Sequence, residues 1–152
     1  MQTKHMVRLG AGAIAAGILL FGAWMIDCDR PVSPDRIPAA AKEFLATHYP
    51  DSRPALVKKE FEHLRITYKV ILTDATKLEF RNNGQWKKVE SKHGIVPVGI
   101  VPPPIQTYID ENFPVCGVSE LKHGRRSYEV ELNNGIDLTF DDSDFFLTDY
   151  DD

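Results

Sequence analysis

The residues best suited to bind a ligand lie at the C-terminal end of the chain, where aspartate is concentrated. Residues 137–152 contain seven aspartates and no lysine or arginine. Three of them, Asp141, Asp142 and Asp144, share the turn that follows Leu138-Thr139-Phe140. Calcium prefers several oxygen ligands on a flexible loop, so this turn is a candidate site for calcium or a small ligand. The turn lacks the glycine and the closing glutamate of an EF-hand, and a solvated acidic edge that discourages strand pairing is the simpler interpretation.

Residues capable of catalysis are present but scattered. The five histidines lie far apart, no serine sits in a glycine-flanked turn, and neither cysteine belongs to a CxxC pair. Cys116 has no neighbouring histidine or basic helix start that would activate its thiol. We therefore expect no enzyme activity, no catalytic residue and no cofactor apart from the calcium considered above. The net charge of −4 also argues against a nucleic-acid-binding protein.

An internal repeat indicates which elements position these residues. Ile37-Pro38 and Tyr49-Pro50 return 64 residues later as Val101-Pro102 and Phe113-Pro114. The pattern Tyr68, Val70, Leu72, Leu78, Phe80 returns 60 residues later as Tyr128, Val130, Leu132, Leu138, Phe140. The smaller offset requires a net four-residue gap between Pro50 and Tyr68, which predicts a longer strand or hairpin in the first copy.

Each copy has the pattern of one helix followed by about four strands. Apolar residues spaced three and four apart predict a helix ending at Pro50 and a second one ending at Pro114. Asn-Gly turns and alternating apolar residues then predict a strand meander. We expect an α+β fold in which two tandem helix-plus-four-strand repeats form one antiparallel sheet with both helices on one face. The expected boundaries are 29–34 for a linker, 35–90 for repeat 1, 91–99 for a second linker and 100–152 for repeat 2.

The strand pattern also selects candidate binding residues. Alternation of period two predicts one buried and one wet face, and it puts Lys69, Ile71, Glu129 and Glu131 on the wet face. These side chains are mostly charged, whereas interface hot spots favour aromatic residues and arginine. Lys69 could also simply form a cross-strand pair with Glu129 or Glu131.

Two adjacent phenylalanines add an aromatic candidate. Asp144-Phe145-Phe146 occupies the place that Gly84-Gln85-Trp86 has in the first copy, so we expect Phe146 and Trp86 in the core. Adjacent strand residues point to opposite faces. Phe145 is therefore either an exposed anchor for a partner or a residue covered by a loop.

The N-terminus carries a targeting signal. Lys4 and Arg8 precede the run Leu9–Ile26, which has 18 residues and no charge. This is long for a signal peptide and just long enough for a membrane span. Residues 1–28 are thus a signal peptide or an N-terminal membrane anchor, and Cys28 could instead be lipidated. In each case the positive flank stays inside, and the rest of the chain lies on the periplasmic or extracellular side of the envelope.

The doubled pattern resembles the tandem PepSY-like proteins that Bacteroidetes secrete, which share a fold with the beta-lactamase inhibitor protein. The residues that carry the resemblance are Ile37-Pro38, Tyr49-Pro50, Tyr68-Lys69-Val70-Ile71-Leu72, Leu78-Glu79-Phe80 and Gly84-Gln85-Trp86, with Val101-Pro102, Phe113-Pro114, Tyr128-Glu129-Val130-Glu131-Leu132, Asn134-Gly135 and Leu138-Thr139-Phe140 in the second copy. The resemblance implies a concave eight-stranded sheet with helices behind it. In the inhibitor relatives, that sheet and a protruding loop grip an enzyme, and no catalytic residue comes with the resemblance.

These observations predict a periplasmic or exported, non-enzymatic binding module. Its exposed sheet face would contact an envelope protein or peptide, as an inhibitor does. The membrane would be a further contact through residues 9–26 if that segment is not cleaved. The alternative is weak calcium or small-ligand binding at the acidic C-terminal turn.

Overall fold

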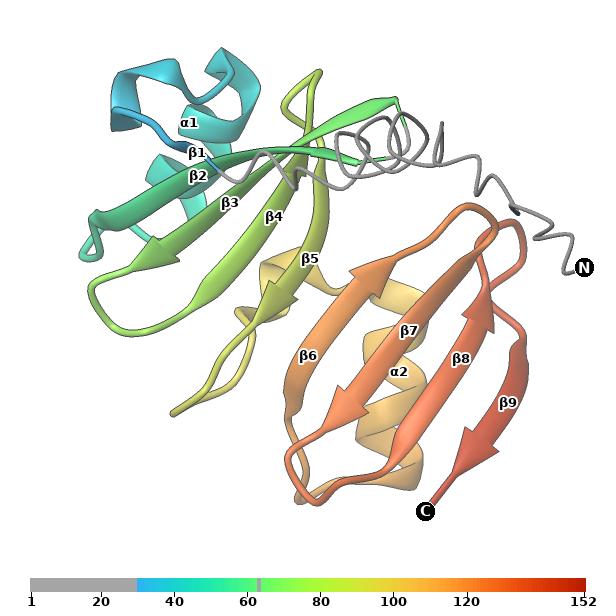
Figure 1. The fold of residues 1–152 in the computed structure, drawn as a ribbon. Helices are drawn as coiled ribbons and strands as arrows, with labels where there is room; N and C mark the ends of the chain where they lie inside the picture. Colours follow the sequence, from blue (N-terminus) through green and yellow to red (C-terminus); the bar gives the residue numbers. More distant parts are fainter. Residues whose placement is uncertain (1–29, 63) are drawn as a thin grey trace, which may run out of the picture.

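The computed structural model describes residues 30–62 and 64–152 (Figure 1). The predicted signal or anchor segment, Cys28 and His63 lie outside the described residues. No helix in the described part of the chain is long and apolar enough to cross a membrane. The elements are, in order, β1 (Arg30–Pro31), a helical turn (Pro34–Arg36), α1 (Ala39–His48), β2 (Pro54–Glu62), β3 (Arg65–Leu72), β4 (Lys77–Arg81), β5 (Trp86–Glu90), a second helical turn (Val98–Ile100), α2 (Pro103–Asn112), β6 (Val118–His123), β7 (Ser127–Leu132), β8 (Asp137–Asp141) and β9 (Leu147–Asp151).

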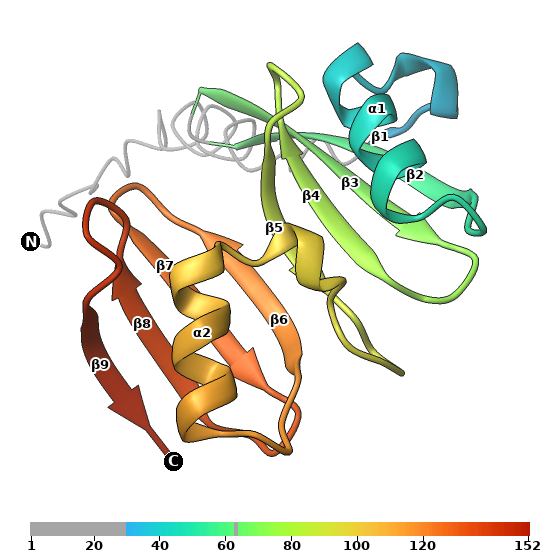
Figure 2. The same cartoon turned by 180° about the vertical axis from the view of Figure 1, so that it is seen from behind.

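The strands form one antiparallel sheet in which each strand pairs with its neighbour in sequence, from β1 to β9. Both helices lie on the same side of this sheet, as the views from the front and from behind show (Figures 1 and 2). The predicted α+β class, single antiparallel sheet and helix placement are therefore confirmed. The sheet has nine strands instead of eight, because part of the segment expected to be a linker forms β1 beside β2.

The helices begin and end at the residues that the repeat picks out. Pro38 and Pro102 are the N-caps, where a missing backbone N–H costs no hydrogen bond. Tyr49 and Phe113 follow the last turns with nearly the same backbone angles, φ −135° and −134°. Each helix thus presents the same short apolar stripe to the sheet.

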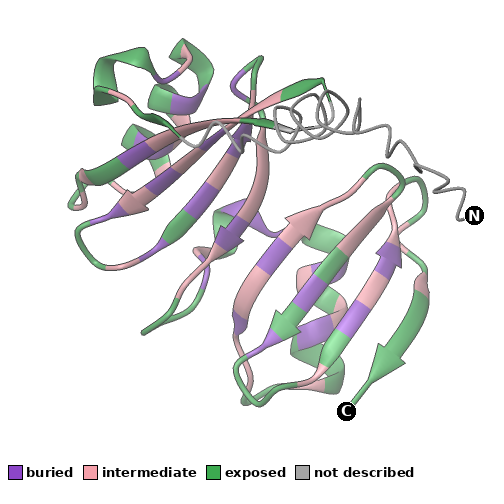
Figure 3. Cartoon of the chain, in the orientation of Figure 1, coloured by how far each residue is buried: buried purple, intermediate pink, exposed green. Residues whose placement is uncertain are grey.

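The core lies between the helices and the sheet. One aromatic ring from each helix packs edge-on against a buried phenylalanine of the sheet: Phe44 on Phe80 at 5.6 Å, and Tyr108 on Phe140 at 5.4 Å. Buried and exposed residues alternate along the strands (Figure 3). This alternation leaves every second side chain of the sheet on the face away from the helices.

The longer first hairpin predicted from the repeat is present. β2 and β3 have nine and eight residues, whereas β6 and β7 have six each. The hairpin extends beyond the strands beside it and carries Phe61 and Leu64, which are 53% and 88% exposed.

Candidate binding face

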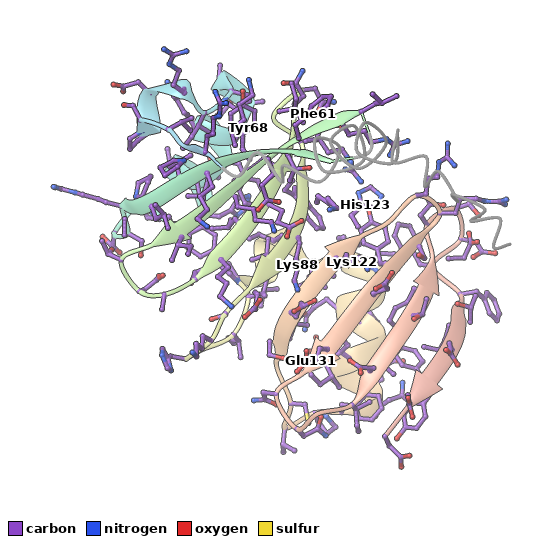
Figure 4. All side chains as sticks on the ribbon, in the orientation of Figure 1. Phe61, Tyr68, Lys88, Lys122, His123 and Glu131 are labelled. Carbon is purple, nitrogen blue, oxygen red and sulfur yellow. The ribbon has the colours of Figure 1, made fainter. Side chains whose placement is uncertain are left out.

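The sheet surface opposite the helices, here called the outer face, is left open by both helices (Figures 1 and 2). Strand register aligns its side chains in two rows that cross the sheet. One row contains Ile71, Lys77, Glu90, Glu120, Glu131, Asp137 and Asp151. The other contains Lys58, Lys69, Glu79, Lys88, Lys122, Glu129, Thr139 and Asp149. Lys88, Lys122 and Glu131 are labelled in Figure 4.

On the first half of the outer face, β2 to β5, positive and negative side chains alternate and pair. Lys69 lies 2.9 Å from Glu60, and Lys87 lies 2.9 Å from Glu79. Lys77 donates a hydrogen bond of 2.7 Å to Glu90, and this bond is the main reason that the pKa of Glu90 lies below its usual value. The charges here are largely compensated within the protein.

A hollow of about 310 Å³ lies among these pairs. Its lining combines the apolar side chains of Leu56 and Ile71 with charged ones from four strands, including Lys69. Leu56 and Ile71 are at least partly accessible on this face. The structure therefore brings Lys69 and Ile71 together, as their alternation in the sequence predicted.

The seam between β5 and β6 joins the two halves through charge pairs and arginine hydrogen bonds. Lys88 and Glu120 pair at 2.8 Å on the outer face. Burial opposes the charge of Lys88, but the hydrogen bond and the charge of Glu120 outweigh burial and raise its pKa. Beside this seam, the Arg81 guanidinium donates to the carbonyl oxygens of Trp86 and His123 at 3.1 and 2.8 Å.

On the second half, β6 to β9, the outer face is acidic and its charges are mostly uncompensated. Glu120, Glu131, Asp137 and Asp151, here called the carboxylate row, occupy directly opposed positions on four adjacent strands. Among the ion pairs of the described residues, Glu120 pairs with Lys88 and Glu129 with Lys122, and none reaches Glu131, Asp137, Asp149 or Asp151. Like charges opposite each other weaken strand pairing. Such local conflicts are expected where a protein carries function.

The two phenylalanines are placed differently from the sequence prediction. Phe146 is 74% exposed, so its expected core position is wrong. Phe145 is half-buried, and its ring stacks on Tyr128 at 5.9 Å. The cause is a turn: Phe145 has φ +58°, and Leu147 instead takes the place opposite Phe140 that Trp86 takes opposite Phe80. Tyr128 belongs to the helix-side set of β7, so Phe145 does not contribute to the outer face.

Two of the three aspartates of the acidic turn, Asp141 and Asp144, hold its backbone by hydrogen bonds. Asp141 accepts hydrogen bonds from the N–H and the hydroxyl of Ser143, and these bonds lower the pKa of Asp141. Asp144 accepts the N–H of Phe146 at 3.0 Å. Within residues 30–62 and 64–152, no group of three or more acidic, histidine or cysteine side chains is placed to hold a metal ion. Calcium binding at Asp141, Asp142 and Asp144 stays a prediction.

Sequence reasoning missed an aromatic stack on the helix side of the seam. His123 lies in β6, and its ring is parallel to that of Tyr128 with 4.3 Å between the ring centroids. Trp86 contacts both rings, at 5.7 and 6.3 Å. Burial is the main cause that lowers the pKa of His123, followed by the charge of Arg81. The sequence carries no signal for this stack, because the contact between Trp86 and His123 depends on the register of β5 and β6.

Comparison with known proteins assigns the class of this fold. Residues 66–148 match the family model described as "Putative beta-lactamase-inhibitor-like, PepSY-like". The chain belongs to this PepSY-like family. No curated protein matches the chain in sequence.

Three solved structures from Bacteroides are similar along nearly their whole length. A "putative periplasmic protein from DUF2874 family" of Bacteroides vulgatus is 35% identical, with a TM-score of 0.80 over 84% of this chain and 99% of that one. A "putative calcium-regulated periplasmic protein" of Bacteroides thetaiotaomicron is 39% identical, with a TM-score of 0.78 over 82% and 97%. A third, a "putative periplasmic protein of unknown function" from Bacteroides vulgatus, is 27% identical, with a TM-score of 0.78 over 82% and 99%. The descriptions of these relatives support an envelope-side location.

Proposed function

We propose that this protein is a non-enzymatic binding module on the periplasmic or extracellular side of the envelope, and that its outer sheet face contacts a protein or peptide. The observation that carries the proposal is the carboxylate row: three of its four members have no ion pair among the described residues, and they lie on a face that no helix covers. The PepSY-like family and the periplasmic descriptions of the relatives support it.

The charge of the outer face indicates the chemistry of the partner. The first half is compensated by its own ion pairs, whereas Glu131, Asp137, Asp149 and Asp151 on the second half have no ion pair within the described part of the chain. Complementary charge mainly accelerates association and selects the partner. We therefore expect a basic segment of the partner over β7 to β9, and an apolar side chain in the hollow beside Ile71.

Site-specific crosslinking in cells tests this proposal. A photo-crosslinking amino acid at Glu131 or Asp137 is expected to trap a protein or peptide. The matched control is the same amino acid at Glu111, an exposed position on α2 on the opposite side of the sheet. Equal adducts at residues 111 and 131, or adducts at residue 111 alone, would contradict the outer face as the binding surface.

Calcium or small-ligand binding at the acidic turn is the second candidate. It is favoured by the description of one relative as a "putative calcium-regulated periplasmic protein", whereas the hydrogen bonds of Asp141 and Asp144 within their own turn weaken it. A ligand that binds only the folded state raises the melting temperature. If millimolar calcium leaves that temperature unchanged relative to magnesium, calcium binding at this turn is rejected.

A further inference from the structure

The β2–β3 hairpin ends in an apolar tip that nothing in the described structure covers. Phe61 and Leu64 are 53% and 88% exposed, and Leu64 has the left-handed angle φ +62° of a turn. Figure 4 labels Phe61 at this end of the sheet. Phe61 lies opposite Ile66 across the hairpin, and Ile66 packs partly buried against the core, so the exposed apolar side chains of the tip are Phe61 and Leu64. Exposed apolar surface at a protruding tip is typical of a contact site.

The direction of β1 relates the start of the described chain to the same end of the sheet. β1 runs antiparallel to β2, with Arg30 opposite Lys59 and Pro31 opposite Lys58. Backward from Arg30, the strand direction therefore leads toward Phe61 and the hairpin turn. Arg30, the first described residue, therefore marks the end of β1 that points toward the apolar tip.

The end of the charge-free run and the end of β2 are separated from the paired residues Arg30 and Lys59 by similar lengths of chain. Only residues 27–29 separate the charge-free run Leu9–Ile26 from Arg30, and three residues span roughly 10 Å when extended. From Lys59, β2 continues for three further residues to its end at Glu62, which is again about 10 Å. A membrane surface at the end of the apolar run would thus lie level with the hairpin tip.

The net charge near the hairpin tip is positive, which favours contact with a membrane surface. Residues 58–66 with Arg30 contain four basic and two acidic residues: Arg30, Lys58, Lys59 and Arg65 against Glu60 and Glu62. Basic residues close to a membrane are attracted to its anionic lipids. The β8–β9 turn carries Asp141, Asp142 and Asp144 instead, and anionic lipids would repel these carboxylates.

We propose that the β2–β3 hairpin tip is a membrane-contacting surface: Phe61 and Leu64 enter the phospholipid headgroup region, and the N-terminal segment holds the chain there. The tip and the N-terminal segment then form two contacts with one membrane. Two such contacts orient the domain, because a single flexible attachment leaves it free to rotate. This inference is independent of the partner at the outer face.

Lipid crosslinking with the full chain in its native envelope tests the proposal. A diazirine amino acid at Leu64 is expected to give several-fold more phospholipid adduct than the same amino acid at Asn134. Asn134 is the matched control because it is exposed in the β7–β8 turn, at the opposite end of the sheet. A Phe61→Ser variant should lower the adduct at residue 64, and circular dichroism checks that the variant stays folded.

Three outcomes would overturn the proposal. The first is equal lipid adduct at residues 64 and 134. The second is an adduct at residue 64 that contains protein in place of lipid, which would indicate a partner or a second copy. The third is an intact mass of the native chain that lacks residues 1–28 and carries no lipid. None of these outcomes bears on crosslinks from Glu131, so the two proposals fail separately.

Discussion

At the scale of single residues, Tyr49 carries a buried polar group without a partner. Its hydroxyl is inaccessible to solvent and has no hydrogen-bond partner among the described residues. Burial, followed by the negative charge of Asp74, raises its pKa well above the usual value. The equivalent residue after α2 is Phe113, which has no hydroxyl and nearly the same backbone angles. At the position equivalent to Tyr49, the second repeat therefore has phenylalanine, a side chain that needs no hydrogen-bond partner when it is buried.

Tyr49→Phe is expected to raise the free energy of unfolding by about 1 kcal/mol, because it removes an unsatisfied buried hydroxyl without changing the ring. Urea denaturation measures the difference. Tyr150→Phe is the matched control, since Tyr150 is exposed and its substitution should change little. A loss of stability in Tyr49→Phe would show that the hydroxyl is hydrogen-bonded.

His123 makes stability depend on pH near neutrality. Burial and then the charge of Arg81 lower its pKa, while the negative charge of Asp142 has the smaller, opposite effect. The folded protein therefore binds a proton at His123 less readily than the unfolded chain does. Stability is full above the unfolded pKa of about 6.5 and falls as the pH drops through that value toward the lower folded pKa.

His123→Gln should flatten this dependence. Unfolding is measured in urea from pH 8 down to pH 5, which spans roughly the ordinary histidine range. His93→Gln is the control. His93 is exposed, so this substitution should not change the dependence of stability on pH. A profile that His123→Gln does not alter would assign the dependence to another group.

At the scale of elements, two Asn-Gly turns have the same backbone and different surroundings. Gly84 has φ +85° and Gly135 has φ +87°. A Cβ atom at Gly84 would lie 2.9 Å from the Cβ of Ala40 on α1, whereas one at Gly135 would meet nothing within 4 Å. The first turn is thus also a docking point for a helix.

Both glycine-to-alanine substitutions should destabilise the fold, but Gly84→Ala more strongly. The left-handed conformation costs each variant roughly 1 kcal/mol. The contact with α1 should add about 1–3 kcal/mol at Gly84 alone. Thermal and urea unfolding of the pair measure the difference directly. Equal losses of stability in the two variants would mean that α1 moves to accommodate the added methyl group at no cost in free energy.

The sequence predicted the elements better than their ends. The four-residue gap in the repeat correctly indicated a longer first hairpin, because register within a hairpin depends on local spacing. Phe146 was misplaced because the turn at Phe145 interrupts the two-residue alternation. β1 was missed because a two-residue strand containing Pro31 has no periodic signal, and only pairing with Lys58 and Lys59 creates it.

At the scale of the whole molecule, the outer face combines two halves with different charge. Alternation in the sequence was sufficient to place Lys69, Ile71, Glu129 and Glu131 on this face. It could not show that Glu120, Glu131, Asp137 and Asp151 form one row, because that requires the register of four strands and the joining of β5 to β6. The distribution of charge across the face is therefore a property of the assembled sheet.

Asp137→Lys tests whether the carboxylate row exists for binding or for stability. Lysine at this position would face Glu131 on one side and Asp151 on the other, replacing two repulsive pairs by two attractive ones. The free energy of unfolding should rise by roughly 0.5–1 kcal/mol at low salt, and the gain should shrink as salt screens the charges.

Crosslinking of the partner from residue 131 should fall in the same variant. Thr139→Lys is the control, because it adds a positive charge in the other row while leaving the carboxylate row intact. If Asp137→Lys is more stable and still captures the partner, the carboxylate row does not select the partner. If the variant is more stable but no longer binds, the protein keeps an unfavourable charge pattern in order to bind.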